Sequence, residues 1–278
     1  MLILNCKGRL ISADEPVVMG ILNITPDSFY DQSRLTTTEE VLTKTQEMVR
    51  SGAGMIDVGG QSTRPGSKRI DAEDEISRIK PVIETIHYHF PQLIISVDTY
   101  HARVAEAAVQ AGASVVNDIS GGLMDTDMIT TVAQLGVAYI CTHMQGTPHT
   151  MQQNPHYDDV VGDLIDFFIH RIALCRQAGI HDVIIDPGFG FGKTFSHNFT
   201  LLSRLEEFQI LNKPMLIGIS RKGTIYKTLG VTAAEALNGT TVLNTVGLMK
   251  GAAILRVHDV KEAREAVILT GKITKPEQ

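Results

Sequence analysis

Cysteine is scarce in this sequence. The 278 residues contain three, Cys6, Cys141 and Cys175, and no CxxC pair occurs. An odd number of widely spaced cysteines argues against a disulfide framework or a cysteine-rich zinc site and favours a reducing compartment. The motifs HExxH and GxSxG are also missing. Their absence argues against a zinc site of that spacing and against an α/β-hydrolase.

Long apolar runs and an excess of basic residues are missing too. No stretch approaches the roughly 20 apolar residues that cross a bilayer, and the first residues lack the pattern of a signal peptide. Lys and Arg number 25 against 31 Asp and Glu, a net charge of −6, whereas nucleic-acid binders usually show a basic excess. We therefore expect a cytoplasmic protein without a membrane or nucleic-acid partner, although a small anionic substrate is compatible with this charge.

Short apolar runs recur along the whole chain and alternate with segments of helical periodicity. Continuous apolar runs are typical of parallel strands that are covered on both faces. The runs cover residues 17–22, 55–58, 93–97, 114–117, 137–141, 183–186, 215–218 and 252–257. The expected helices begin at a capping-box signal in 37–40 and continue with 71–88, 102–110, 126–134, 156–178, 197–207, 232–250 and 259–269.

Eight strand–helix units predict an α/β fold, a (β/α)₈ TIM barrel. An open, doubly wound sheet remains the alternative, because periodicity does not say whether a sheet closes. Residues 1–14 precede the first barrel strand and are expected to form a short β-hairpin around Lys7 and Gly8. No linker divides the chain, so residues 1–278 are expected to form one domain.

Polar residues follow the predicted strands at their carboxyl ends, where a barrel builds its active site. Any one of them alone is more often a helix cap or a turn former, but every unit carries at least one. They are Asn23, Asp57, Asp98, Asn117, Asp118, His143, Asp186, Ser220, Arg221, Lys222, Arg256 and His258.

Two glycine-rich segments stand beside these strand ends. Residues 59–67 combine backbone N–H groups, hydroxyls and one arginine, which suits an anionic oxygen cluster. Residues 186–194 lack the spacing of a nucleotide-binding phosphate loop and instead suit a flat ligand in a tight pocket. A hard cation such as Mg²⁺ is also compatible, because it needs few protein ligands when a substrate pyrophosphate supplies the others.

Seven motifs in this order resemble the dihydropteroate synthase family of pterin-binding barrels, over nearly the whole chain from Met19 to Asp259. They are Asn23–Phe29, Gly59–Gly66, Val97–Thr99, Val116–Asp118, Asp186–Lys193, Ser220–Lys222 and Arg256–Asp259. The resemblance implies a transferase of folate biosynthesis and a target of sulfonamides. Its reaction condenses 6-hydroxymethyl-7,8-dihydropterin pyrophosphate with p-aminobenzoate and gives 7,8-dihydropteroate and pyrophosphate. The family also implies a Mg²⁺ cofactor and a homodimer.

The resemblance further implies a role for individual residues. The pterin ring is expected to contact Asp98, Asn117, Asp186, Lys222 and Arg256. The pyrophosphate is expected to contact Asn23, Thr63, Arg256 and His258, with Asn23 as the protein ligand of Mg²⁺. The p-aminobenzoate site is expected to comprise Phe29, Thr63, Pro65, Phe191 and Ser220. Catalytic roles fall to Lys222 and to Asp31 and Arg64, which would hold two loops together over the substrates.

The family mechanism is a dissociative, SN1-like displacement without a covalent enzyme intermediate. Two alternatives remain open at this point. A methyltransferase domain that binds methyltetrahydrofolate would share Asp98, Asn117 and Asp186 but would not need the anion site of Asn23, Thr63, Arg256 and His258. A non-catalytic pterin-binding paralogue would usually lose the loop residues that remain here.

Overall fold

The barrel sheet is parallel and closes on itself. The computed structural model describes residues 2–24, 34–61 and 70–274, and within them eight parallel strands form one sheet in the order β8-β7-β6-β5-β4-β3-β10-β9. A parallel bridge between Ile185 and Met215 joins β8 to the start of β9, and the Ile185 N–H donates to Pro214 O at 2.9 Å. The alternative of an open sheet is therefore wrong.

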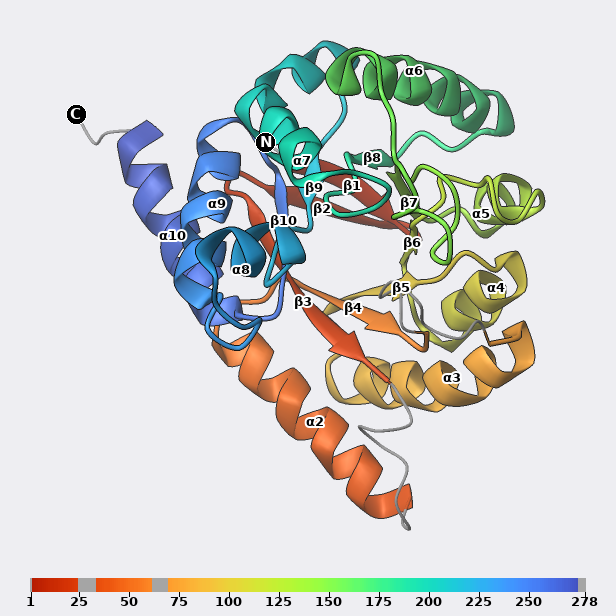
Figure 1. Ribbon diagram of the computed structural model, residues 1–278. Coiled ribbons are helices and arrows are strands. Elements are labelled where there is room, and N and C mark those ends of the chain that lie inside the picture. Colours follow the sequence, from red (N-terminus) through yellow and green to blue (C-terminus); the bar gives the residue numbers. More distant parts are fainter. Residues whose placement is uncertain (1, 25–33, 62–69, 275–278) are drawn as a thin grey trace.

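The strands agree with the predicted apolar runs to within two residues at each end. They are β3 (Val17–Asn23), β4 (Met55–Gly59), β5 (Ile94–Asp98), β6 (Val115–Asp118), β7 (Ala138–Thr142), β8 (Val183–Asp186), β9 (Leu216–Ile217) and β10 (Ile254–Val257). Helices connect them around the outside of the barrel (Figure 1). No helix in the described ranges combines the length and apolar character needed to cross a membrane.

The helices differ from the predicted ones at several places. They are α2 (Arg34–Arg50), α3 (Ala72–His89), α4 (Ala102–Ala111), α5 (Met128–Leu135), α6 (Val160–Ala178), α7 (Phe195–Ser203), η1 (Leu205–Leu211), α8 (Gly223–Leu229), α9 (Leu237–Met249) and α10 (Val260–Thr274). The differences include the first residues of α6 and α9 and the last of α10. The capping-box signal at 37–40 lies inside α2, and the segment 197–207 is divided between α7 and the 3₁₀ helix η1. The sequence did not predict α8, because seven residues are too few to show helical periodicity.

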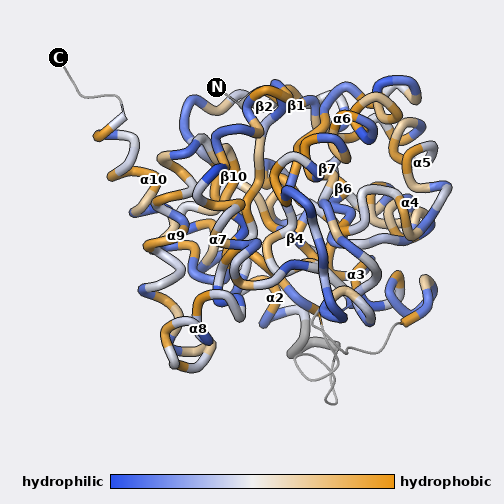
Figure 2. Tube along the Cα trace, turned by 45° about the horizontal axis from the view of Figure 1, so that its top comes forward, coloured by the Kyte–Doolittle hydropathy of each residue, from blue (hydrophilic) through white to orange (hydrophobic). Residues whose placement is uncertain are grey.

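The predicted hairpin closes the end of the barrel where the strands begin. Strands β1 (Leu2–Cys6) and β2 (Arg9–Ala13) are antiparallel, and the turn between them places Lys7 at φ 55° and Gly8 at φ 81°. Figure 2 shows this hairpin at one end of the barrel and α8 at the other. Leu4 and Cys6 are buried in one cluster with the first interior side chain of every barrel strand, so the hairpin is an apolar plug.

Alternation along the strands divides the barrel interior into an apolar and a polar level. Residues two apart on a strand face the same side, so Met55, Asp57 and Gly59 of β4 all point inward. The register pairs Met55 with Ile94 at the lower level and Asp57 with Ser96 at the next. The polar interior residues therefore gather at the carboxyl ends of the strands, where the barrel opens.

Because the hairpin packs as an apolar plug, truncating one of its buried side chains should lower the free energy of unfolding. Leu4 is 1% exposed, and replacing it with alanine should lower the free energy of unfolding by about 2–5 kcal/mol, the usual range for a buried leucine. Leu10, on the same hairpin, is 70% exposed, and Leu10→Ala should change it by less than about 0.5 kcal/mol. Urea denaturation of both variants measures the difference. Equal effects would show that the hairpin does not belong to the cooperative core.

Candidate active site

Three carboxylates and one carboxamide lie buried inside the mouth of the barrel. They are the side chains of Asp57 on β4, Asp98 on β5, Asn117 on β6 and Asp186 on β8. The register pairs Asp98 directly with Asn117. Of the two polar residues that end β6, Asn117 points inward, whereas Asp118 accepts hydrogen bonds from Ser120 and from the Tyr139 hydroxyl. Asp118 therefore shapes the loop after β6 and lies outside this group.

Arg256 of β10 joins two of these carboxylates across the barrel. Its Nε donates to Asp57 Oδ2 and its Nη2 donates to Asp98 Oδ2, both at 2.6 Å. Burial raises the pKa of Asp98 to about 7; the Arg256 charge opposes that rise, and Asp57 and Asp118 add to it. Burial by itself lowers the pKa of Arg256, but attraction to Asp57 and Asp98 outweighs it, so the net change is upward. A permanent cation therefore stands between two buried acids.

Lys222 provides a second cation beside Asp186. Its ammonium group donates to Phe189 O and lies 4.3 Å from the centre of the Phe191 ring. Burial lowers the pKa of Lys222 to about 8, against the attraction of Asp186. Burial also raises the pKa of Asp186, although Lys222 and the hydrogen bond from the Gly188 N–H, 2.7 Å from Oδ1, oppose that rise. A ligand that hydrogen-bonds to the Asp186 carboxylate would therefore change the pKa values of both Asp186 and Lys222.

A buried lysine, Lys193, organises the glycine-rich loop between β8 and α7. Its Nζ lies 3.1 Å from Gly188 O, 3.0 Å from Phe191 O and 2.9 Å from His143 Nδ1. Gly188 has φ +68°, and a Cβ there would collide with His143 O, so only glycine fits this close approach. The loop carbonyls thus turn toward an amine of the chain itself, whose pKa burial lowers well below the usual value for lysine, and this agrees with the absence of phosphate-loop spacing.

The motifs at the ends of β9 and β10 are joined residue by residue. Ser220 Oγ accepts from the His258 backbone N–H at 3.2 Å and lies 3.0 Å from His258 Nδ1. The serine oxygen can accept from Nδ1–H as well as from the backbone N–H, or its hydroxyl can donate to Nδ1, and in either case the contact holds the orientation of the His258 ring. Arg221 donates through Nε and Nη2 to the two oxygens of Asp259, each at 2.8 Å. Ser220 and Arg221 thus hold the loop that presents Lys222 and His258.

Asn23 stands at the end of β3, next to this group. Gly59 pairs with Asn23 on one side and with Asp98 on the other. A Cβ built on Gly59 would lie 3.6 Å from both Asn23 Oδ1 and Asp98 Oδ2, so the two oxygens border the same point of the mouth. The carboxamide oxygen is a hard donor of the kind that Mg²⁺ takes, and Mg²⁺ needs few such protein ligands.

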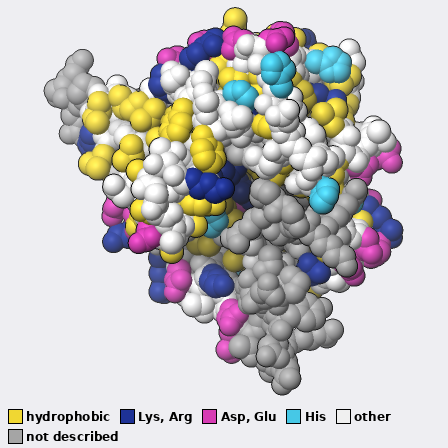
Figure 3. Space-filling model, in the orientation of Figure 1, with side chains coloured by type: hydrophobic (Ala, Val, Ile, Leu, Met, Phe, Trp, Pro, Cys, Tyr) yellow, Lys and Arg dark blue, Asp and Glu magenta, His cyan; other side chains and the backbone are white. Residues whose placement is uncertain are grey.

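The structure brings together most of the residues that the resemblance singled out. They are Asn23, Asp98, Asn117, Asp186, Phe191, Ser220, Lys222, Arg256 and His258. Phe29, Asp31, Thr63, Arg64 and Pro65 lie outside the described residues. Figure 3 shows Lys and Arg side chains beside a hollow near the middle of one face. Among the residues that the structure describes, no group of three His, Cys, Asp or Glu side chains is arranged to hold a metal.

Sequence reasoning gave no role to three residues that support the site, Asp57, Lys193 and Glu75. A signal for Asp57 was present, because it interrupts the apolar run of β4. Lys193 ends a motif that was recognised but whose lysine was left without a function. Glu75 lies on a helix among other acidic residues, but its place four residues before Ile79, on the apolar stripe of that helix, is a signal that could have identified it as buried.

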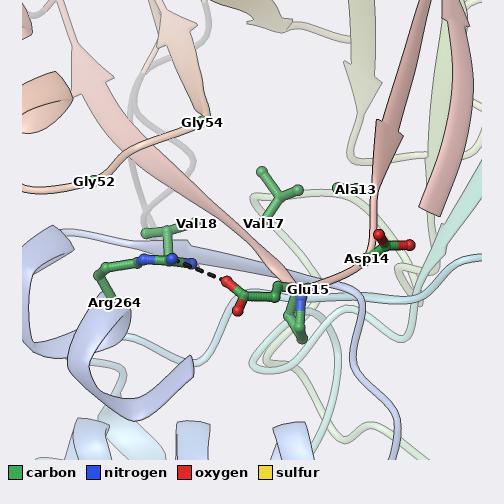
Figure 4. Close-up of a pocket in the computed structure, with 9 residues that line it drawn as sticks. Ala13, Asp14, Glu15, Val17, Val18, Gly52, Gly54 and Arg264 are labelled. Carbon is green, nitrogen blue, oxygen red and sulfur yellow. Dashed lines mark ion pairs between the residues drawn. The ribbon is translucent and has the colours of Figure 1, made fainter. Parts of the chain in front are cut away.

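A concave surface at the opposite end of the barrel has a different character. It lies where the segment between β2 and β3 meets α10, and Figure 4 shows Glu15 and Arg264 facing one another across it. The two side chains form an ion pair at 2.9 Å, so their charges compensate each other. This end of a barrel generally serves stability, and the polar cluster lies at the other end.

Comparison with known proteins agrees with this geometry. Residues 19–258 match the family described as "Pterin binding enzyme". The dihydropteroate synthase of Escherichia coli K12 is 43% identical over 263 residues, which are 94% of this chain and 93% of that protein. The structure of the Yersinia pestis enzyme with a sulfonamide drug superposes with a TM-score of 0.92 at 38% identity, over 98% of this chain and 99% of that one. The Xanthomonas albilineans enzyme with 4-aminobenzoic acid gives 0.91 at 37% identity, over 99% of both chains.

A closed barrel with buried acids and cations at its mouth is the architecture of the pterin-binding enzymes, and this chain is one of them. Within that class it belongs to the dihydropteroate synthase family of transferases. The expected fold and family are confirmed. The named relatives are synthases rather than methyltransferases, which decides between those two interpretations.

Glu75 lies behind the site, and its environment favours the protonated acid. The side chain is 1% exposed, and the Thr99 hydroxyl donates to its Oε2 at 3.3 Å. Its Oε1 has no hydrogen-bond partner in the described part of the chain. Burial raises the pKa of Glu75 to about 8, and the nearby Asp98 adds to the rise.

Glu75 should make the protein less stable as the pH rises. The folded chain keeps a proton on Glu75 up to about pH 8, whereas the unfolded chain loses it near pH 4.5, so the free energy of unfolding falls in between. Glu75 alone accounts for a loss of about 2 kcal/mol from pH 6 to pH 8. Thermal or urea unfolding of Glu75→Gln should lack that part, while Glu84→Gln, exposed on the same helix, should keep it. An unchanged pH slope in Glu75→Gln would contradict the assignment.

Proposed function

We propose that this chain condenses 6-hydroxymethyl-7,8-dihydropterin pyrophosphate with p-aminobenzoate, releasing pyrophosphate and 7,8-dihydropteroate. One observation carries the proposal. Two cations, Arg256 and Lys222, stand among three buried carboxylates at one barrel mouth. Such a mouth offers acceptors for a flat, N–H-rich ring and positive charge for a departing diphosphate. The Xanthomonas relative that binds 4-aminobenzoic acid supports the second substrate.

The acidic side of the mouth is suited to the pterin ring. An aminopyrimidinone edge presents adjacent N–H donors, and a carboxylate accepts two of them with a strong geometric preference. Asp186 is placed for this role, because one of its oxygens already accepts from Gly188 and Lys222 lies beside it. Asp98 and Asn117 would contact the ring further round the mouth, and Phe191 stands over Lys222.

The basic side would stabilise the leaving group. As the methylene C–O bond breaks, its electron pair leaves with the diphosphate, and negative charge develops on the oxygen. Arg256 and His258 would receive this charge together with Asn23. Ser220 supports this role, because its contacts with Nδ1 and with the backbone N–H hold the His258 ring in place.

Asn23 would be the protein ligand of Mg²⁺. Its exposed carboxamide oxygen and the nearby carboxylate of Asp98 form a hard-oxygen environment, and substrate phosphates would complete the coordination. When bound, the ion supplies additional positive charge for the diphosphate. The chain's own contribution is to hold the diphosphate in place through Arg256 and His258.

The second half of the reaction joins nitrogen to carbon. The cation left on the methylene carbon is conjugated with the pterin, and the lone pair of the aniline nitrogen attacks it, after which that nitrogen loses a proton. No strong base is needed, because the amine is already neutral. Positioning therefore dominates, and exclusion of water protects the cation. Asp31 and Arg64 are proposed to hold the loops that provide this exclusion, with Phe29, Thr63 and Pro65 at the aromatic acid.

The assignment of Asp186 makes a direct prediction. Asp186→Ala should weaken pterin binding by about a hundredfold or more, because it removes a charged acceptor and leaves Lys222 buried beside it. Calorimetry with a pterin ligand measures affinity, and pyrophosphate release with both substrates measures turnover. Asp182→Ala, directly before the same strand, is the matched control and should retain both. Near-normal pterin affinity in Asp186→Ala would refute the assignment.

A homodimer in the cytoplasm is proposed as the working form. The packed helices α9 and α10 expose several large apolar side chains, over which Figure 3 shows a hydrophobic patch. They are Val242, Met249, Ile268, Leu269 and Ile273. Exposed apolar patches of this kind commonly mark protein interfaces. A second copy of the chain is the partner that the family implies.

The proposed interface predicts that a single charged side chain within it weakens dimerisation. Leu269 is 65% exposed, so Leu269→Glu should leave the monomer folded but weaken association at least about tenfold, by burying an unpaired carboxylate in the contact. Sedimentation velocity over a concentration series measures the change. Leu10→Glu, on the exposed side of the hairpin, should sediment as the wild type does. If both variants remain dimeric, the contact lies on another face.

A further inference from the structure

Asp57 is the buried carboxylate to which the proposed reaction gives no role. It lies in the middle of the barrel interior on β4 and is 0% exposed. One oxygen, Oδ2, accepts from Arg256 Nε at 2.6 Å and from Asn117 Nδ2 at 3.0 Å. The other, Oδ1, has no hydrogen-bond partner among the described residues. Asp57 is therefore the common neighbour of a cation and a neutral carboxamide that both face the substrate site.

The carboxylate determines which way the Asn117 amide points. A side-chain amide has a donor end and an acceptor end of nearly the same shape, and only its partners distinguish the two orientations. A carboxylate paired with a guanidinium accepts hydrogen bonds and offers none, so Nδ2 must face Asp57. Asn117 Oδ1 then points the other way, and it is buried without a partner in the described part of the chain. A buried acceptor without a partner costs free energy, so a ligand that places a hydrogen-bond donor against it binds better than one that does not.

The same carboxylate oxygen also fixes Arg256. The guanidinium is held at Nε by Asp57 and at Nη2 by Asp98, so its plane cannot rotate. Hydrogen bonds thus link the side chains of Asn117, Asp57, Arg256 and Asp98 in one chain, and the backbones of Asp98 and Asn117 are neighbours in the register of β5 and β6. Asp57 thereby fixes the orientation of both Asn117 and Arg256.

We propose that Asp57 is a positioning residue that determines ring specificity, by making Asn117 present its carbonyl oxygen to the heterocycle. The inference rests on the proposed function, in which Asn117 contacts the pterin. A carbonyl at that position accepts a ring N–H and repels a bare ring nitrogen. The reduced 7,8-dihydropterin carries an N–H at N8, where the oxidised pterin has an unprotonated nitrogen. The site therefore prefers the reduced ring.

The proposed role differs measurably from that of a simple counter-charge. If Asp57 only neutralised Arg256, its loss would weaken every ligand of the site by the same factor. If it orients Asn117, its loss changes the ratio between ligands that differ in one donor. In Asp57→Asn the new amide can donate to Asn117 Oδ1 as well as accept from Nδ2, so Asn117 is free to take both orientations.

The experiment compares two probes on the full chain. Calorimetry under anaerobic conditions gives the affinities of 6-hydroxymethyl-7,8-dihydropterin and 6-hydroxymethylpterin. The wild type should bind the reduced compound at least about tenfold more tightly. Asp57→Asn should reduce this preference to about threefold or less. A loss of affinity by the same factor for both compounds would overturn the proposal.

Three further variants keep the test decisive. Asn117→Ala should lose the preference in the same way, and adding Asp57→Asn to it should change the ratio no further, since coupled residues are non-additive. If Asn117→Ala keeps the full preference, the proposal is wrong even should Asp57→Asn fail to fold. Ser96→Ala is the matched control, because Ser96 is buried beside Asp57 in the register, and it should leave the ratio unchanged.

The affinities of the wild type for the two compounds distinguish a failure of this inference from a failure of the proposed function. Equal affinity of the wild type for the two compounds would overturn the inference alone. Binding of neither compound would overturn the proposed function and the inference with it.

Discussion

The Arg256 guanidinium, held between the buried carboxylates of Asp57 and Asp98, is the interaction on which the site depends. Charges removed from water are unfavourable unless each finds a partner, and the loss of one partner leaves the others exposed to that cost. The barrel provides those partners because the interior positions of its strands converge at one mouth. The apolar plug below and the charged ring above are two consequences of the same alternation along the strands.

Around this ion pair, the surrounding loops are held by groups that need not touch substrate. Lys193 gathers loop carbonyls beside His143, and Ser220 holds the orientation of the His258 ring. Arg221 and Asp259 clamp the ends of the last two strands together. Motifs that read as one functional block therefore combine residues of the site with residues that position them. Ser220 illustrates the distinction: the family resemblance places it at the aromatic acid, and the structure joins it to His258.

The electrostatics of the mouth follow from burial more than from any single pair. Burial raises the pKa of Asp98, Glu75 and Asp186 and lowers that of Lys222. Asp98 and Glu75, with pKa values of about 7 and 8, and Lys222, with a pKa of about 8, therefore all titrate close to neutrality. A ligand with several N–H donors would favour the ionised carboxylates on binding. Binding of such a ligand would replace ion pairs within the protein by contacts between the protein and the ligand, with a small change in net charge.

Local sequence determined the eight strands, most of the helices and the residues at the strand ends, because period-two and helical patterns reflect contacts with immediate neighbours. It also carried the family resemblance, since the motifs are short and ordered. It did not determine that the sheet closes, nor that Asp57 meets Arg256, which is 199 positions away in the chain. The local pattern did not show that Asn117 points inward and Asp118 outward, although the family resemblance gave a role to Asn117 alone. Those facts belong to the tertiary structure, because barrel closure alone decides which distant strand ends become neighbours and which buried charge each of them must satisfy.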